Sequence, residues 1–212
     1  MLNSENQEMK VKICGITSYQ DALGVVESGA DAMGFVFYEP SKRFIRPQQA
    51  QAIINQLGSN VNIKKVALFV NASSIFVQKV LDKVNIDIIQ FHGGESAAYC
   101  EQFNKPYIKA VAMNDKIDLD IIAKQYINAC ALLLDTPSQY FGGTGQAFDW
   151  AVIPRFEQKP LILAGGLTVS NVAQAIEQVN PFAVDVSSGV EESPGIKNIQ
   201  LVKNFVENAK NA

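Results

Sequence analysis

Cys14 is the first residue whose type and position could do chemistry, because it ends the short apolar segment 11–14. A thiolate is a good base or nucleophile, and backbone amides of a helix beginning near Ser18 could stabilise one. The other interpretation is that Cys14 is a small buried apolar residue, as unpaired cysteines often are. Cys100 lies within a helical pattern and Cys130 just before a predicted strand, so both are typical of packing residues.

Asp135 follows an apolar run, and a partly desolvated carboxyl group there holds its proton more readily, which suits a general acid. The alternative is that Asp135 caps the following loop. If Cys14 and Asp135 end two well-separated strands of a closed sheet, they could address a ligand from opposite sides. Ring opening and proton transfer on a sugar need an acid and a base arranged in this way.

Arg43 and His92 are candidates for substrate binding. The guanidinium group of Arg43 could bind a substrate carboxylate with two hydrogen bonds, although a solvated loop charge is the simpler alternative. His92 is the only histidine in the chain and ends a predicted strand. A single histidine is more often structural, but this position also fits a site role.

Two glycine-containing segments predict a phosphate site. Gly165 and Gly166 follow one predicted strand, and Ser187, Ser188 and Gly189 follow the next. Glycines let a backbone approach a phosphate closely, and amides at the ends of neighbouring strands commonly bind phosphate in α/β barrels. Either segment alone could be a tight turn, whereas the two together favour phosphate.

The elements that must position these residues alternate between short apolar strands and helical patterns. We expect strands at residues 11–14, 32–37, 65–70, 86–91, 107–112, 131–135, 161–164 and 183–186. Helical patterns begin near residues 18, 47, 73, 95, 115, 149, 169 and 196, with that at 149–156 the shortest. Eight such units predict a single (β/α)8 TIM barrel with a closed parallel sheet, whose active site lies at the carboxyl ends of the strands. An open doubly wound sheet is the competitor, but its G-x-G-x-x-G fingerprint does not follow the first strand.

Lys12 shares the face of Cys14 by two-residue alternation, so both are predicted to point into the barrel. A buried lysine needs a partner, and Asp185 is the candidate because the eighth strand adjoins the first. Asp185 also lies near the end of that strand, so it is a candidate substrate-binding residue as well. Coordinates that placed the two head groups out of contact would contradict this pairing.

Composition bounds the possible partners. The chain has 212 residues, a formal net charge of −3 and 48% hydrophobic residues, which is typical of a globular protein without a nucleic-acid footprint. We expect a small phosphorylated molecule as the substrate, no nucleic-acid or membrane partner, and a monomer or homodimer. Residues 1–9 form a polar N-terminal extension without signal-peptide character, and residues 10–212 form the catalytic barrel. Widely spaced cysteines predict no metal site and a reducing cytoplasm.

Taken together, the motifs resemble those of the phosphoribosylanthranilate isomerase family of tryptophan biosynthesis. The matching segments, in family order, are KICGIT (12–17), GADAMGFVFYEPSKRFI (29–45), QFHGGE (90–95), LLLDT (132–136), FGGTGQAFDW (141–150), LAGGL (163–167) and AVDVSSGVEESPGIKN (183–198). KICGIT combined with DVSSGVE is the specific part of this resemblance.

The resemblance implies an Amadori rearrangement of N-(5-phosphoribosyl)anthranilate that needs no metal or organic cofactor. It also implies that Cys14 is the general base, Asp135 the general acid and Arg43 the ligand of the anthranilate carboxylate. The amides around Gly166, Ser188 and Gly189 would then bind the phosphate.

Other functions on the same barrel remain as alternatives. An indole-3-glycerol-phosphate synthase relies on lysine and glutamate, and a ribulose-phosphate epimerase relies on aspartates, histidines and a metal. A cysteine at the first strand argues against both. A barrel that only binds phosphate, as an assembly module, is disfavoured because the acid, the base and the carboxylate-binding residue are all present.

Overall fold

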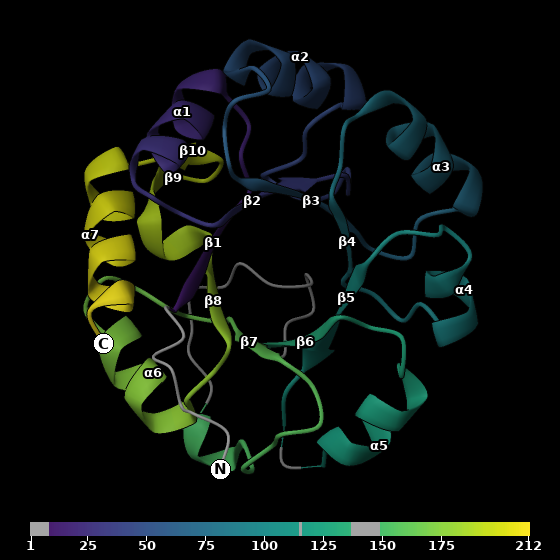
Figure 1. Ribbon diagram of the computed structural model, residues 1–212, viewed down its shortest axis with the longest axis vertical. Helices are drawn as coiled ribbons and strands as arrows, with labels where there is room; N and C mark the ends of the chain where they lie inside the picture. Colours follow the sequence, from purple (N-terminus) through teal and green to yellow (C-terminus); the bar gives the residue numbers. More distant parts are fainter. Residues whose placement is uncertain (1–8, 115, 137–148) are drawn as a thin grey trace.

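The computed structural model describes residues 9–114, 116–136 and 149–212, which form a closed barrel of eight parallel strands. Each strand pairs with the next along the chain, and the last pairs with the first (Figure 1). The predicted barrel is therefore confirmed. Its strands are β1 (Lys10–Cys14), β2 (Ala32–Val36), β3 (Lys64–Phe69), β4 (Ile88–Phe91), β5 (Tyr107–Ala112), β6 (Ala131–Asp135), β7 (Leu161–Leu163) and β8 (Ala183–Val186).

An outer ring of helices covers the sheet (Figure 1). The described α-helices are α1 (Tyr19–Glu27), α2 (Pro47–Leu57), α3 (Ser74–Lys83), α4 (Ala97–Glu101), α5 (Leu119–Gln125), α6 (Val172–Val179) and α7 (Ile199–Lys210). Two 3-10 turns, η1 (Trp150–Val152) and η2 (Ser188–Val190), and a hairpin of β9 (Glu191–Ser193) and β10 (Ile196–Lys197) complete the described elements.

Local sequence signals account for several helix starts. The side chain of Ser18 accepts a hydrogen bond from the amide of Asp21 at the start of α1, and that of Ser73 accepts one from Phe76 at the start of α3. Each satisfies an amide that the first helical turn would leave unpaired. Pro47 opens α2, where its missing N–H costs nothing.

Several sequence-based element boundaries were wrong, two of them for a clear local reason. A helix over residues 149–156 does not form, because Pro154 disfavours helical backbone at the preceding residue, and Ile153 is extended. The helix expected from Ile196 begins at Ile199, after Asn198 has capped it, and Ile196 belongs to β10 instead. The start predicted at Asp115 and the N-terminal extension up to residue 8 lie outside the described residues.

The helices are short. The longest described helix, α7, spans 12 residues, and none in the described part of the chain combines the length and apolarity required to cross a membrane.

Candidate active site

The candidate residues gather where the barrel strands end. Cys14 is the last residue of β1 and Asp135 the last residue of β6, while His92 follows β4 directly. Gly165 and Gly166 come just after β7, and β8 leads into Ser187 and η2. Parallel strands of one closed barrel all end on the same side, so these residues line one mouth. Strands β7 and β8 separate β6 from β1, so Asp135 and Cys14 come from separate parts of the rim.

The predicted pairing of Lys12 with Asp185 is confirmed. The two residues are register partners on β1 and β8, and Nζ of Lys12 donates to Oδ1 of Asp185 at 2.9 Å. Both side chains are buried. A Cβ added to Gly34 would lie 2.8 Å from Sγ of Cys14 and 3.2 Å from Nζ of Lys12. The thiol and the ammonium group therefore share the space that the missing side chain of Gly34 leaves.

The Cys14 thiol lies in an environment of opposing influences. Burial raises its pKa, the Lys12 ammonium lowers it, and the Asp185 carboxylate raises it further, with a raised pKa as the result. Burial alone would lower the pKa of Lys12, but Asp185 and Cys14 outweigh that effect and raise it. At neutral pH the thiol thus keeps its proton in the unliganded protein. The charge that favours a thiolate is Lys12, rather than the helix amides that the sequence suggested.

Asp135 and His92 contact each other directly. Nε2 of the imidazole lies 3.2 Å from Oδ2 of the carboxyl group, and Nδ1 lies 3.0 Å from Nε2 of Gln90. Gln90 and Asp135 therefore contact the two ring nitrogens of His92 and fix the orientation of the imidazole. His92, which the sequence suggested as a substrate ligand, is therefore also a neighbour of the candidate acid.

Gly165 fits closely against the candidate acid. Its φ of +76° favours glycine, and an added Cβ would lie 2.6 Å from the amide nitrogen of Thr136 and 2.9 Å from Oδ1 of Asp135. That carboxyl oxygen also accepts a hydrogen bond from the same amide at 2.8 Å. A side chain at residue 165 would displace Asp135, so this glycine shapes the acid site as well as the loop.

The two loops predicted to bind phosphate lie side by side. A Cβ on Gly189 would come within 1.9 Å of the carbonyl oxygen of Leu167, so the η2 turn contacts the β7 loop. Among the described residues, the amides of Gly166, Ser188 and Gly189 have no hydrogen-bond acceptor. Asn171 braces the first loop by donating to the carbonyl of Gly166 at 3.0 Å. Unpaired amides from adjacent loops form a site suited to an anion.

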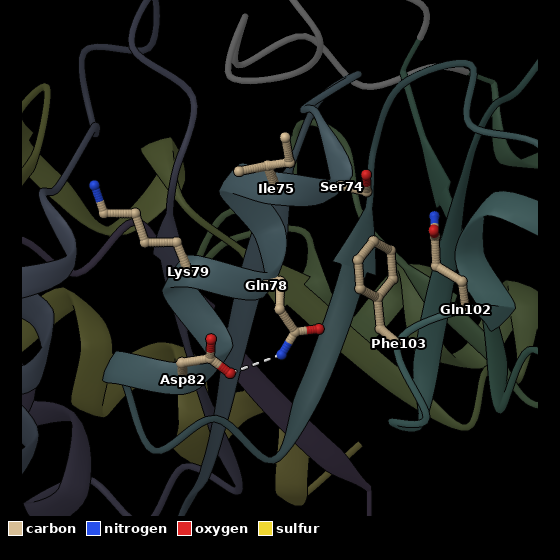
Figure 2. Close-up of a pocket in the computed structure, with 7 residues that line it drawn as sticks. All are labelled: Ser74, Ile75, Gln78, Lys79, Asp82, Gln102 and Phe103. Carbon is tan, nitrogen blue, oxygen red and sulfur yellow. Dashed lines mark hydrogen bonds between the residues drawn. The ribbon is translucent and has the colours of Figure 1, made fainter.

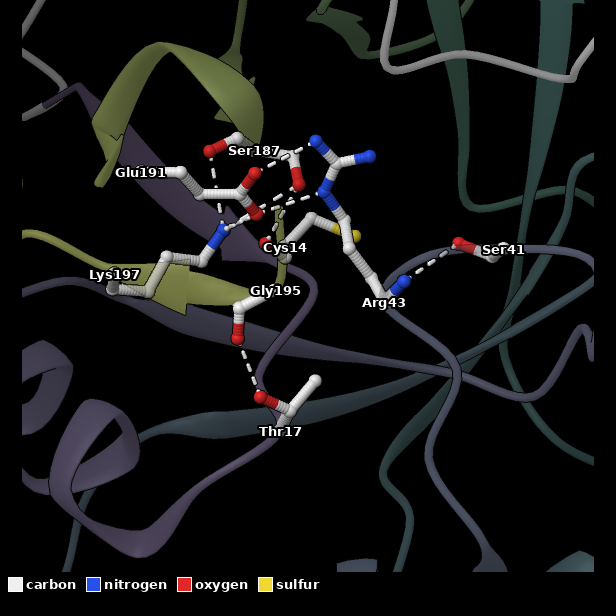
Figure 3. A network of polar contacts seen from close by, with 8 residues as sticks. All are labelled: Cys14, Thr17, Ser41, Arg43, Ser187, Glu191, Gly195 and Lys197. Atoms are coloured by element: carbon white, nitrogen blue, oxygen red, sulfur yellow. Dashed lines mark hydrogen bonds and ion pairs between the residues drawn. The ribbon is translucent and has the colours of Figure 1, made fainter. Parts of the chain in front are cut away.

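Arg43 lies against the backbone next to Cys14 and is not a solvated charge. Its side chain is 13% exposed, and a Cβ on Gly15 would lie 2.6 Å from its Cδ atom. Nε and Nη2 donate to the two carboxylate oxygens of Glu191 at 2.8 and 2.7 Å (Figure 3). The sequence did not anticipate that one edge of the guanidinium group is already occupied.

Lys197 joins Glu191 to the β8 loop. Its Nζ donates to Oε1 of Glu191 at 2.8 Å and to the carbonyl of Ser187 at 3.1 Å, and its side chain is 0% exposed. The hydroxyl of Ser187 donates to the carbonyl of Cys14 at 3.0 Å (Figure 3). Burial raises the pKa of Glu191, but Arg43 and Lys197 outweigh it, so the pKa is lowered and the group is ionised.

Glu191, Lys197 and Gln90 are the residues that sequence reasoning missed. All three lie inside the quoted motifs, yet nothing in their spacing shows that their side chains turn toward the site. The segment FGGTGQAFDW (141–150) falls almost wholly outside the described residues. No cluster of three or more His, Cys, Asp or Glu side chains suited to a metal occurs in the described ranges.

A separate groove of about 550 Å³ lies between α3 and the segment that follows α4. Figure 2 shows its polar wall, where Gln78 donates to Asp82 at 2.7 Å within α3. Phe103 contributes to the opposite wall. None of the candidate catalytic residues lines this groove, so it is not part of the active site.

Fold and site together define a TIM-barrel enzyme that arranges a thiol, a carboxyl group and two glycine-containing loops around one barrel mouth. The chain belongs to the N-(5'-phosphoribosyl)anthranilate isomerase family, and the family model for N-(5'phosphoribosyl)anthranilate (PRA) isomerase matches residues 11–208. It is thus an isomerase by family.

Curated relatives agree over nearly the whole chain. The N-(5'-phosphoribosyl)anthranilate isomerase of Nitrosococcus oceani is 50% identical over 198 residues, which cover 93% of this chain and 95% of that protein. The enzyme of the same name from Pseudomonas putida is 48% identical over 205 residues, covering 96% and 98%.

Solved structures agree as well. The phosphoribosyl anthranilate isomerase of Thermotoga maritima superposes with a TM-score of 0.88 at 42% identity, covering 96% of this chain and 100% of that one. A phosphoribosyl anthranilate isomerase in complex with reduced 1-(o-carboxyphenylamino)-1-deoxyribulose 5-phosphate has a TM-score of 0.84 at 40% identity, with the same coverage.

Proposed function

We propose that this isomerase converts N-(5-phosphoribosyl)anthranilate to 1-(2-carboxyphenylamino)-1-deoxyribulose 5-phosphate in tryptophan biosynthesis, with Cys14 as general base and Asp135 as general acid. The observation that carries the proposal is that both groups end strands of one barrel, beside Lys12 and His92 respectively. The name shared by the relatives supports the substrate.

Asp135 acts first. Its carboxyl proton passes to the ring oxygen of the ribose, the bond between that oxygen and C1 breaks, and the nitrogen lone pair forms the C1=N bond of a Schiff base. His92 supports this role because its Nε2 lies 3.2 Å from Oδ2 of Asp135, within hydrogen-bonding distance of the carboxyl group. Gly165 supports the position of the carboxyl group because its missing side chain leaves the room that Asp135 occupies.

Cys14 acts second, as a thiolate. It removes the proton from C2, the electron pair forms C1=C2, and the C1=N pair returns to nitrogen, which gives an enolamine and a thiol. The enolamine then gains a proton at C1 and loses the C2 hydroxyl proton to become the ketone. Lys12 supports this step because its ammonium group stabilises negative charge on the sulfur.

The remaining groups hold the substrate. The amides of Gly166, Ser188 and Gly189, which have no acceptor among the described residues, bind the phosphate, and Arg43 binds the anthranilate carboxylate. Because these anchors bind the two ends of the substrate, the reacting carbons are held between Cys14 and Asp135. Positioning of this kind lowers the barrier without any new covalent chemistry.

The cellular setting follows from the same proposal. All three cysteines are free thiols, which fits a reducing cytoplasm. We infer a small phosphorylated substrate as the principal partner and a monomer or a homodimer as the assembly. One of the Thermotoga maritima structures concerns monomers generated from a dimeric isomerase.

The test is the loss of anthranilate-type fluorescence when purified protein is added to N-(5-phosphoribosyl)anthranilate. The protein should consume the substrate, and Cys14→Ala and Asp135→Asn should each lower kcat by about 10²–10⁴-fold, the range for a lost acid or base. Both variants should still bind the reduced product analogue. An inactive wild-type protein would refute the function, and a Cys14→Ala variant with near-normal turnover would refute the assigned base.

A further inference from the structure

Glu191 holds one edge of the Arg43 guanidinium group and leaves the other edge free. A guanidinium group has five N–H donors and two edges that can each bind a carboxylate with two hydrogen bonds. Glu191 occupies the edge formed by Nε and Nη2, at 2.8 and 2.7 Å. Three donors remain, and in Figure 3 Nη1 points away from Glu191. A second carboxylate can therefore bind with two hydrogen bonds only along the free edge formed by Nη1 and Nη2, so Glu191 determines the direction from which that carboxylate binds.

The net charge around Arg43 depends on Glu191 and Lys197. Arg43 and Glu191 alone form a neutral pair, which attracts a further carboxylate weakly. Lys197, also bonded to Glu191 at 2.8 Å, adds a second cation. Burial lowers the pKa of Lys197 and Glu191 opposes that effect, and the protonated ammonium group brings the three groups to one net positive charge. The Lys197 side chain is fully buried, so solvent screens its charge only weakly from an anion bound at Arg43. This cluster (Arg43, Glu191 and Lys197) thus fixes the orientation of the guanidinium group, and its net positive charge attracts an anion.

The β9–β10 hairpin and its hydrogen bonds hold this cluster in place. Glu191 and Lys197 are register partners in the β9–β10 hairpin, so they face each other. Thr17, in the loop after β1, donates from its hydroxyl to the carbonyl of Gly195 at the turn of that hairpin (Figure 3). The hairpin is therefore fixed to the segment that carries Cys14, and it sets where Arg43 lies relative to the thiol.

From these contacts we propose that Glu191 and Lys197 are positioning residues that aim the free edge of Arg43 at the substrate carboxylate and make the site specific for a carboxylated arylamine. This inference rests on the proposed binding of the anthranilate carboxylate by Arg43. Glu191 fixes the orientation, and Lys197 offsets the charge of Glu191 so that the cluster still attracts an anion.

Calorimetric binding of two stable ligands tests the proposal. The first is the reduced 1-(2-carboxyphenylamino)-1-deoxyribulose 5-phosphate, and the second is its phenylamino analogue without the carboxylate. Glu191→Gln should lower the preference for the carboxylated ligand over the phenylamino analogue by about tenfold or more, which corresponds to about 1.4 kcal/mol of binding free energy. Kinetically, KM for the substrate should rise while kcat is largely retained. The matched control is Glu192→Gln, an exposed neighbour whose change should leave the ratio as in the wild type.

A double variant separates positioning from folding. Glu191→Gln leaves Lys197 buried without its carboxylate, whereas Glu191→Gln with Lys197→Met removes both charges together. The double variant should bind ribose 5-phosphate normally, which reports an intact phosphate site, and still discriminate poorly between the two ligands. Normal discrimination by the folded double variant would overturn the proposal.

Arg43→Gln distinguishes this inference from the function on which it rests. If Arg43→Gln leaves the affinity ratio unchanged, then Arg43 does not bind the carboxylate and that part of the proposed function fails. If Arg43→Gln abolishes the discrimination but Glu191→Gln does not, only the positioning role fails.

A measurement on the wild-type protein needs no variant. In ¹⁵N NMR spectra, the Nε–H signal of Arg43 should keep its position when the carboxylated ligand is added, because Glu191 holds that donor in both states. The Nη signals should shift. A large shift of Nε–H, with the Glu191 contact exchanged for the ligand, would overturn the proposal.

Discussion

Lys12 is the cation that the thiol of Cys14 meets inside the barrel, and it also forms an ion pair with Asp185 at 2.9 Å. Removing Lys12 alone would leave a buried carboxylate without a partner, which is strongly destabilising. Removing both members of the pair avoids that cost. The paired change is therefore the sharper test of what Lys12 does for the thiol.

In the variant Lys12→Met with Asp185→Asn, we expect the pKa of Cys14 to rise. Lys12 lowers that pKa by more than Asp185 raises it, so the loss of both moves it upward. If the thiolate is the base, kcat/KM increases with pH as Cys14 loses its proton, and the variant should need a higher pH to reach its maximum. The pH profile of kcat/KM measures this, because it reports the free enzyme.

The control for this variant is Lys65→Met with Asp87→Asn. That pair is also a lysine and an aspartate in contact, at 3.0 Å, and neither residue belongs to the candidate site. Its profile should match that of the wild type. An unshifted profile in the Lys12 variant would show that Cys14 is not the titrating base or that Lys12 does not act on it.

At the scale of elements, the contact between the β7 loop and the η2 turn decides whether the unpaired amides converge. Gly189 has an ordinary backbone conformation, so the case for glycine there is steric: its Cβ would meet the carbonyl of Leu167 at 1.9 Å. A backbone atom cannot rotate aside as a flexible side chain can. A side chain at residue 189 must therefore separate the two loops.

Gly189→Ala should weaken the binding of inorganic phosphate and raise KM by about tenfold or more, the effect of losing roughly one charge-assisted hydrogen bond. The matched control is Gly94→Ala in the loop after β4, where the Cβ would meet only Asn71 at 3.8 Å. Calorimetric titration with phosphate measures both. Equal phosphate affinity in Gly189→Ala and the wild type would show that the amides of this turn do not bind the phosphate.

Sequence patterns predicted most of the elements, because each strand is a short apolar run bounded by a polar loop. They also predicted the ion pair of Lys12 and Asp185, since alternation along one strand and adjacency of the first and last strands are both consequences of a closed barrel. Features of this kind follow from local periodicity and topology alone.

The contact of Arg43 with Glu191 was not predictable in the same way. The two residues are 148 positions apart, and they meet only because a short hairpin after η2 folds back toward the loop after β2. The contact of His92 with Asp135 likewise depends on side-chain rotamers at two strand ends. Periodicity fixes which residues reach the barrel mouth, whereas it does not fix which of them pair there.

At the scale of the whole molecule, buried titratable groups couple the stability of the barrel to pH. Burial raises the pKa of Cys100 to about 12 from an ordinary value of 9.0, and the residue is fully enclosed in the core. Between these two values the folded state keeps the proton and the unfolded state loses it. Stability from this group is therefore complete below about pH 9 and is lost as the pH rises toward 12.

The free energy of unfolding should thus fall as the pH rises from about 9, by at most about 1.4 kcal/mol per pH unit for each such group. Cys100→Ala should lower stability near neutral pH, because it leaves a small cavity, but should flatten this alkaline decline. Val80→Ala is the control: Val80 is as deeply buried and carries no proton to lose, so its variant should be less stable yet keep the wild-type slope. Urea unfolding at a series of pH values gives the free energy of unfolding of each variant and its slope with pH. If Cys100→Ala kept the full alkaline slope, the decline would come from other groups, such as the buried tyrosines whose pKa values are also raised.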